Sequence, residues 1–164
     1  MIRRPLLALL VLVLALPACD TNEEQNSFFV EAEQRPNAYT ATSETGAVLE
    51  LDADDWRVAP AFRGAVEVTP AFPNPVTRGG LVSLTIQDTF DDAIVGGIFV
   101  SGRPGNNPGQ TLRLAEDNSA GPVYVLDFNP NRLRLTTGDD AQLFRVRVFT
   151  QDFRLITYGD ILVR

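Results

Sequence analysis

The chain of 164 residues is long enough for one domain with a hydrophobic core and too short for two domains of ordinary size. Its hydrophobic content of 45% is that of a globular protein, which excludes a disordered chain and a protein with several membrane spans. The formal net charge of −7 argues against nucleic acid as a partner, because phosphate binding depends on a basic surface.

The N-terminal residues have the pattern of an export signal. Arg3 and Arg4 form a short positive segment, and residues 6–16 are an unbroken apolar run. Such a run matches the hydrophobic region of a signal peptide and is shorter than a normal bilayer span. We therefore expect residues 1–18 to be a cleaved signal peptide.

The end of the apolar run carries a short motif, Leu16-Pro17-Ala18-Cys19. An aliphatic, a variable and a small residue before a cysteine resemble the lipobox of bacterial lipoproteins. In that family the cysteine thiol receives a diacylglycerol, and acyl chains anchor the cleaved protein to a membrane. The resemblance implies that Cys19 is the lipidation site, on the periplasmic face of a membrane or at the cell surface. Cys19 is also the only cysteine, so no disulfide can form within the chain.

Residues 19–46 are expected to be the lipidated N-terminus and a flexible tether, because residues 20–27 are polar and carry no apolar anchor. Phe28, Phe29 and Val30 could instead open a first strand at 28–33. After them the sequence returns to Pro, Asn, Thr and Ser. We place the folded domain at residues 47–164.

Beyond residue 47 the hydrophobic pattern alternates with a period of two in short segments separated by Gly, Pro, Asn and Asp. We expect strands at 47–51, 66–68, 81–86, 94–100, 111–114, 123–128, 132–136, 143–150 and 161–163. This number and spacing of strands predict an all-β domain. We expect a single antiparallel β-sandwich of immunoglobulin-like type, with a small β-barrel as the alternative.

Two segments resemble parts of known domains. Residues 138–148, a turn and then an alternating strand, resemble the sixth-strand region of immunoglobulin-like and fibronectin-like domains. The motif Phe72-Pro73-Asn74-Pro75-Val76 resembles the opening of the C-terminal sorting domains of the type nine secretion pathway. The second resemblance implies a surface-display sorting module. The interpretation that we favour is a turn, set by two prolines and an asparagine, that leads into a strand.

Histidine and lysine are absent from the sequence. This excludes Ser-His-Asp and Cys-His catalysis, histidine-bound metals and lysine nucleophiles. With Cys19 lipidated, cysteine-bound metals are excluded as well, and only carboxylate chemistry is left. We expect no catalytic residue, no metal ligand, no cofactor and no enzyme activity. The alternative is a carboxylate-dependent hydrolase acting on envelope glycans.

Aspartates at turns are the candidates for that chemistry or for calcium binding. They form three groups: Asp52, Asp54 and Asp55; Asp88, Asp91 and Asp92; and Asp139 with Asp140. None has the spacing of an EF-hand loop, and we interpret them as solvated turn residues. Trp56 beside the first group could stack on a sugar ring, although a core position is the commoner role of a single Trp.

Further candidates concern binding surfaces. Five arginines lie on neighbouring predicted strands: Arg113, Arg132, Arg134, Arg145 and Arg147. If their side chains all point outward, they would form a basic sheet face that could bind an anionic glycan or an acidic partner. Exposed pairing with acids is the interpretation that we favour. Residues 101–109 form a predicted long loop suited to a binding tip. Gly96 and Gly97, inside a predicted strand, indicate a bulge or a close backbone approach.

The sequence therefore predicts a membrane-anchored lipoprotein of the cell envelope. Its sandwich would serve as a non-enzymatic binding or structural module, with the membrane as one partner through the lipid and an envelope protein or glycan as another. The sequence assigns no residue to the binding site, which is unknown from the sequence alone.

Overall fold

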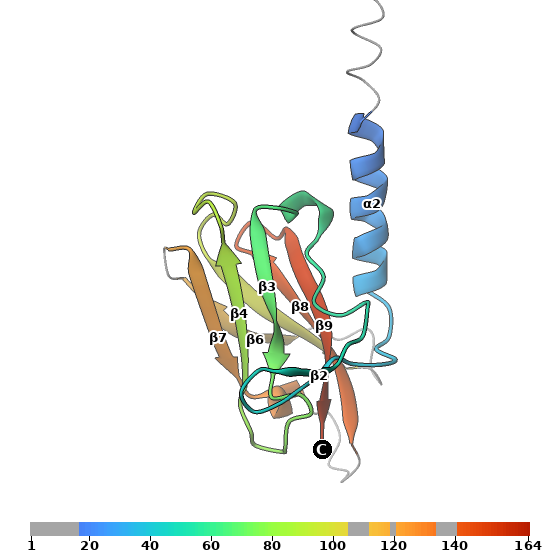
Figure 1. Cartoon of the computed structure of the whole chain (residues 1–164), viewed down its shortest axis with the longest axis vertical. Helices are drawn as coiled ribbons and strands as arrows, with labels where there is room; N and C mark the ends of the chain where they lie inside the picture. The colour runs from blue at the N-terminus through green and yellow to red at the C-terminus, as the bar shows by residue number, and fades with distance from the viewer. Residues whose placement is uncertain (1–16, 105–111, 119–120, 134–140) are drawn as a thin grey trace, which may run out of the picture.

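The computed structural model describes residues 17–104, 112–118, 121–133 and 141–164. Two antiparallel sheets pack together, so the expected all-β sandwich is confirmed (Figure 1). Each sheet keeps its own edge strands in the described part of the chain, and the fold is therefore not the small barrel that was the alternative.

The smaller sheet has the order β3-β4-β7 and the larger one the order β6-β5-β8-β9. The smaller sheet contains β3 (Val66–Phe72), β4 (Val82–Asp88) and β7 (Val123–Phe128). The larger sheet contains β5 (Ile98–Pro104), β6 (Leu112–Asp117), β8 (Gln142–Thr150) and β9 (Leu155–Val163). A short outer ribbon pairs β1 (Ala41–Thr42) with β2 (Val48–Glu50), and two 3₁₀ turns lie at η1 (Pro60–Phe62) and η2 (Pro130–Leu133).

The order of these strands is immunoglobulin-like. Lettered A to G along the chain from β3 to β9, the sheets read A-B-E and D-C-F-G. The constant-type immunoglobulin arrangement places strand D beside E. Here β6, the fourth strand, pairs with β5 and has joined the other sheet.

The core lies between the sheets and follows the alternation seen in the sequence. Val82, Leu84 and Ile86 of β4 are fully buried, as their spacing predicts. From the opposite sheet, Val146 and Val148 of β8 are fully buried as well. Removal of these side chains from water is the main force that holds the two sheets together.

The segment before the sandwich differs from its prediction. Residues 17–32 form helix α2 (Pro17–Ala32), so the expected strand at 28–33 is wrong, and the polar residues 20–27 are helical instead of a flexible tether. The buried contact between the helix and the body is formed by Phe28 and Ala32. These residues are four positions apart and therefore share one face of the helix. Such a short apolar stripe leaves no helical periodicity to detect in the sequence.

The folded body also begins before residue 47, where the predicted domain starts. Thr40 and Thr42 are buried, and Thr42 bridges to Asn74. By contrast, Leu49 in β2 and Leu51, directly after it, are each 70% exposed, although the sequence predicts a half-buried strand. The ribbon lies outside the two main sheets, so alternation there does not correspond to a core face.

Two further strands differ in their bounds from the prediction. The expected strand at 132–136 begins in η2, and residues 134–136 lie outside the described residues. The last strand is nine residues long instead of three, because Thr157, Gly159 and Asp160 interrupt its apolar pattern without ending it.

Gly96 and Gly97 lie directly before β5 and not inside a strand. A Cβ on Gly97 would overlap the backbone at Asp117, which confirms the predicted close approach.

One end of the sandwich lies on the side toward which the N-terminal part of α2 extends beyond the body (Figure 1). It is formed by η1, by the β4–β5 loop (residues 89–97) and by the β8–β9 turn (residues 151–154). We call it the helix end. The turn between β3 and β4 lies at the opposite end, because neighbouring strands are antiparallel.

Candidate functional site

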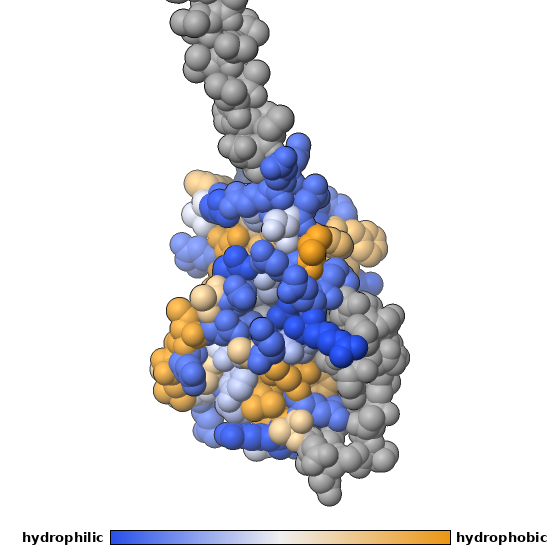
Figure 2. Space-filling view, turned by 90° about the vertical axis from the view of Figure 1, so that its right-hand side faces the viewer, coloured by the Kyte–Doolittle hydropathy of each residue, from blue (hydrophilic) through white to orange (hydrophobic). Residues whose placement is uncertain are grey.

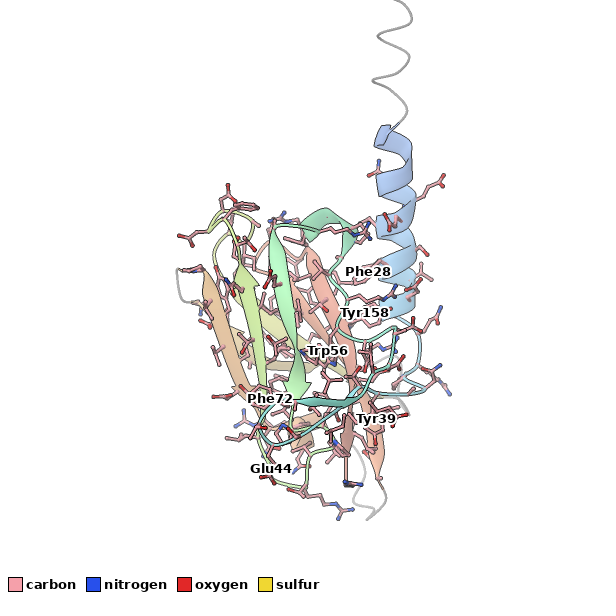
Figure 3. The ribbon with its side chains drawn as sticks, in the orientation of Figure 1. Phe28, Tyr39, Glu44, Trp56, Phe72 and Tyr158 are labelled. Atoms are coloured by element: carbon pink, nitrogen blue, oxygen red, sulfur yellow. The ribbon has the colours of Figure 1, made fainter. Side chains whose placement is uncertain are left out.

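Helix α2 covers the outer face of β8 and β9. The ring of Phe28 lies 5.0 Å from that of Tyr158, and Figure 3 shows the two side chains pointing toward one another. The Tyr158 hydroxyl donates to Glu31 Oε2 at 3.1 Å and accepts a bond of 2.7 Å from Arg57 Nη2. Burial raises the pKa of Tyr158 to about 12. The helix is therefore joined to the sheet through an aromatic and charged contact.

Arg145 and Asp160 form the centre of this contact. Arg145 Nε donates to Asp160 Oδ1 at 2.8 Å and Arg145 Nη2 to Oδ2 at 2.6 Å, in the two-point geometry that suits a guanidinium. Arg145 Nη1 donates to the carbonyl of Glu31 at 2.7 Å, and its guanidinium lies 4.9 Å from the ring centre of Tyr158. Arg145 is 4% exposed and Asp160 is fully buried, so the pair is a structural one.

Asp55 joins the same cluster from the other side. Its Oδ2 accepts the Thr40 amide at 2.7 Å and its Oδ1 accepts the Asp160 amide at 2.9 Å. Burial, and then the neighbouring charge of Asp160, raise the pKa of Asp55 to about 7. Of the three aspartates in this stretch, Asp55 is buried, whereas Asp54 is exposed and Asp52 Oδ1 caps the Asp54 amide. The group does not converge on a ligand.

Arg147 lies beside Arg145 on β8 and is also covered. It is 5% exposed and forms an ion pair with Glu33, directly after the end of α2. Arg113 is exposed and pairs with Glu116 at 2.8 Å. The proposed open face of arginines is therefore wrong, because the N-terminal segment covers its two central members. Arg132 lies on η2, and Arg134 is outside the described residues.

Asn74, in the middle of the Pro-Asn-Pro motif, is fully buried and joins three segments. Its Nδ2 donates to the carbonyls of Thr40 and Asp160, each at 2.8 Å, and its Oδ1 accepts the Leu162 amide at 2.9 Å. The motif does turn between β3 and β4, as we favoured. Its asparagine also joins the segment before β1 to the last strand. The sequence motif does not predict this role, which depends on the burial of the Asn74 side chain.

A groove of about 550 Å³ lies between α2 and the segment around η1. Its lining is of mixed charge and includes Glu24, Phe28, Glu31, Arg57 and Arg63. Glu24 Oε1 pairs with Arg63 at 2.7 Å, and Glu31 pairs with Arg57. Hydrogen bonds from these arginines lower the pKa of both carboxyls. A glycosidase needs one carboxyl with a raised pKa as general acid, and these two have the opposite shift.

Trp56 is a core residue. It is 5% exposed, and its ring lies on Gly159 of β9 so closely that a Cβ there would overlap it. This burial removes the ring from any sugar in solvent, so the stacking hypothesis is wrong.

In the second aspartate group Asp88 is structural, whereas Asp91 and Asp92 are exposed. Asp88 is buried and its carboxylate accepts three backbone amides of the following loop, those of Phe90, Asp91 and Ile94. Among the described residues no three acidic, cysteine or histidine side chains come together as a metal site. Asp139 and Asp140 lie outside the described residues, as do residues 105–109 of the predicted binding loop.

Cys19, the predicted lipidation residue, lies in the first turn of α2. In the described part of the chain, no helix combines the length and the apolar character needed to cross a bilayer. No protein-family model matches the sequence, and no curated protein is significantly similar to it.

Proposed function

We propose that this protein is a lipid-anchored component of the cell envelope whose sandwich acts as a non-enzymatic binding or structural module. In this proposal the acyl chains on Cys19 hold the protein at a membrane, and helix α2 is the stalk between lipid and body.

The observation that carries the proposal is the continuity of α2. One helix contains Cys19 and, nine residues later, Phe28, which is buried against Tyr158. At 1.5 Å per residue, this separation is roughly 14 Å along the helix axis. Ion pairs from Glu24, Glu31 and Glu33 reinforce the contact with the body. A lipid at Cys19 would therefore hold the sandwich at a defined distance from the bilayer.

A non-enzymatic role is supported by the state of the acidic and basic groups. Asp55, Asp88 and Asp160 use their carboxylate oxygens to hold backbone amides or Arg145. The groove beside α2 offers paired charges from Glu24 with Arg63 and Glu31 with Arg57, which suit a polar partner such as an envelope protein or glycan.

The test is the chemical state of Cys19 in the native host. Mass spectrometry of the N-terminal peptide should show cleavage before Cys19 and a diacylglyceryl thioether, and the protein should fractionate with membranes. The matched control is Cys19→Ser, which keeps the signal and removes the sulfur. An unmodified thiol on a fully water-soluble protein would overturn the proposal.

A further inference from the structure

Three strongly exposed apolar side chains lie at the helix end of the sandwich. Phe90 and Val95, in the β4–β5 loop, are 66% and 65% exposed, and Phe153, in the β8–β9 turn, is 77% exposed. In the view of Figure 2, hydrophobic atoms lie among hydrophilic ones in the upper part of the body as well as lower down. Such side chains are costly to leave in water when they project from neighbouring loops.

Hydrogen bonds from backbone amides order both of these loops. Phe153 has a φ of 65°, in the left-handed region that a bulky residue rarely adopts, and its amide donates to the Thr150 carbonyl at 3.0 Å. Its ring rests edge-on against Phe99, with 5.6 Å between centroids. In the β4–β5 loop, Asp88 accepts the Phe90 amide. Both rings are therefore displayed by ordered turns.

The distance from these loops to Cys19 follows from α2. The Glu24–Arg63 ion pair joins the helix to the segment directly after η1, which belongs to the helix end. Cys19 is five residues before Glu24, so it lies roughly 7–8 Å farther along the helix axis. The headgroup layer of a bilayer is itself about 5–8 Å thick on each side. A lipid on Cys19 therefore brings the helix end to the level of the headgroups.

We propose that the helix end rests on the bilayer, with Phe90, Val95 and Phe153 inserted into its interfacial layer. The inference rests on the proposed lipidation of Cys19. It makes the sandwich a second membrane contact, with α2 and the two loops fixing the body's orientation on the surface.

The charge of this end predicts which lipids favour the contact. Asp91 and Asp92 are exposed in the same loop as Phe90. Acidic side chains are repelled by anionic headgroups, whereas burial of apolar area does not depend on lipid charge. Insertion should therefore be deeper in zwitterionic bilayers than in anionic ones.

The test uses the full lipidated protein in phosphatidylcholine vesicles. Because Cys19 is the only natural cysteine and is modified, Phe153→Cys supplies a single thiol for an environment-sensitive fluorophore. The matched control is Leu81→Cys, a residue 61% exposed in the turn at the opposite end. Lipids brominated near the headgroup should quench the label at position 153 several-fold more strongly than the label at 81.

Two further measurements sharpen the result. Adding Phe90→Asp and Val95→Asp to the Phe153→Cys protein should reduce the quenching, and both positions are exposed, so the fold should tolerate the change. Replacing part of the phosphatidylcholine with phosphatidylglycerol should also reduce it. An increase with phosphatidylglycerol would overturn apolar insertion as the cause of the contact.

The state of Cys19 in the same sample separates the two proposals. If mass spectrometry finds no lipid there, the proposed function fails. If the lipid is present and labels at 153 and 81 report the same aqueous environment, only the membrane contact of the helix end is wrong.

Discussion

Arg145 of β8 and Asp160 of β9 face each other across the sheet and share two hydrogen bonds of 2.8 and 2.6 Å beneath helix α2. The pair connects three parts of the chain, because Arg145 also bonds the Glu31 carbonyl and the Asp160 amide bonds Asp55. This buried cluster is where α2, the segment before η1 and the last strand meet.

Removing one partner of this pair should be costly. We expect Arg145→Met to lower the free energy of unfolding by about 3–5 kcal/mol, because Asp160 would be left buried without its counter-charge. Urea unfolding measures the loss. The control is Arg113→Met at the exposed pair with Glu116, which should cost less than about 1 kcal/mol. Combining Arg145→Met with Asp160→Leu should recover part of the stability. Equal losses for the buried and exposed pairs would contradict the assignment.

The carboxyl of Asp55 should make stability depend on pH. Its pKa is raised to about 7 in the folded protein from an ordinary value of 3.8, so the folded state binds more protons than the unfolded state between these values. The free energy of unfolding should therefore fall as pH rises from about 4 to about 7, by up to about 1.4 kcal/mol per unit from this group, and then level off.

Asp55→Asn isolates this contribution. The neutral amide cannot ionise, so the difference in stability between wild type and variant should itself vary with pH across the same window. The variant should also be less stable at low pH, because its amide group can no longer accept both the Thr40 and Asp160 amides. A pH-independent difference in urea unfolding would show that Asp55 does not titrate in this range.

Asn74 should be one of the most sensitive polar positions. Asn74→Ala removes bonds to the Thr40 and Asp160 carbonyls and to the Leu162 amide, leaving buried groups without partners. We expect a loss of about 2–4 kcal/mol in unfolding free energy. Hydrogen exchange at the Leu162 amide should accelerate in step. Asn22→Ala, at an exposed position of α2, is the control and should leave stability nearly unchanged.

Gly159 should tolerate no side chain while Trp56 keeps its place. Gly159→Ala would force the ring away from β9, at a cost of about 1–3 kcal/mol. Trp56 is the only tryptophan, so its emission should shift to the red as the ring meets water. In a Trp56→Ala background the same glycine substitution should cost much less. Unchanged emission in Gly159→Ala would mean that the ring does not depend on this glycine.

The pattern of the sequence predicts the sandwich well because a strand's side chains alternate between two faces. Val82, Leu84 and Ile86 show this alternation directly, and all three are in the core. The same rule fails at Leu49 and Leu51, since alternation alone does not tell a core face from an outer ribbon. It also misses α2, whose buried contact rests on Phe28 and Ala32.

By itself, then, the sequence determined the all-β class, the buried face of the central strands and the absence of histidine and lysine chemistry, and it predicts an anchor at Cys19. These follow from composition and from residues close together in the chain. The tertiary structure alone decided that Arg145 and Arg147 are covered, that Asp55 is buried beside Asp160 and that Asn74 joins the segment before β1 to the last strand. The environments of these residues are formed by segments that are distant in the sequence. Burial determines the energetic cost of a charge or an amide, and these side chains become buried only when those segments pack together.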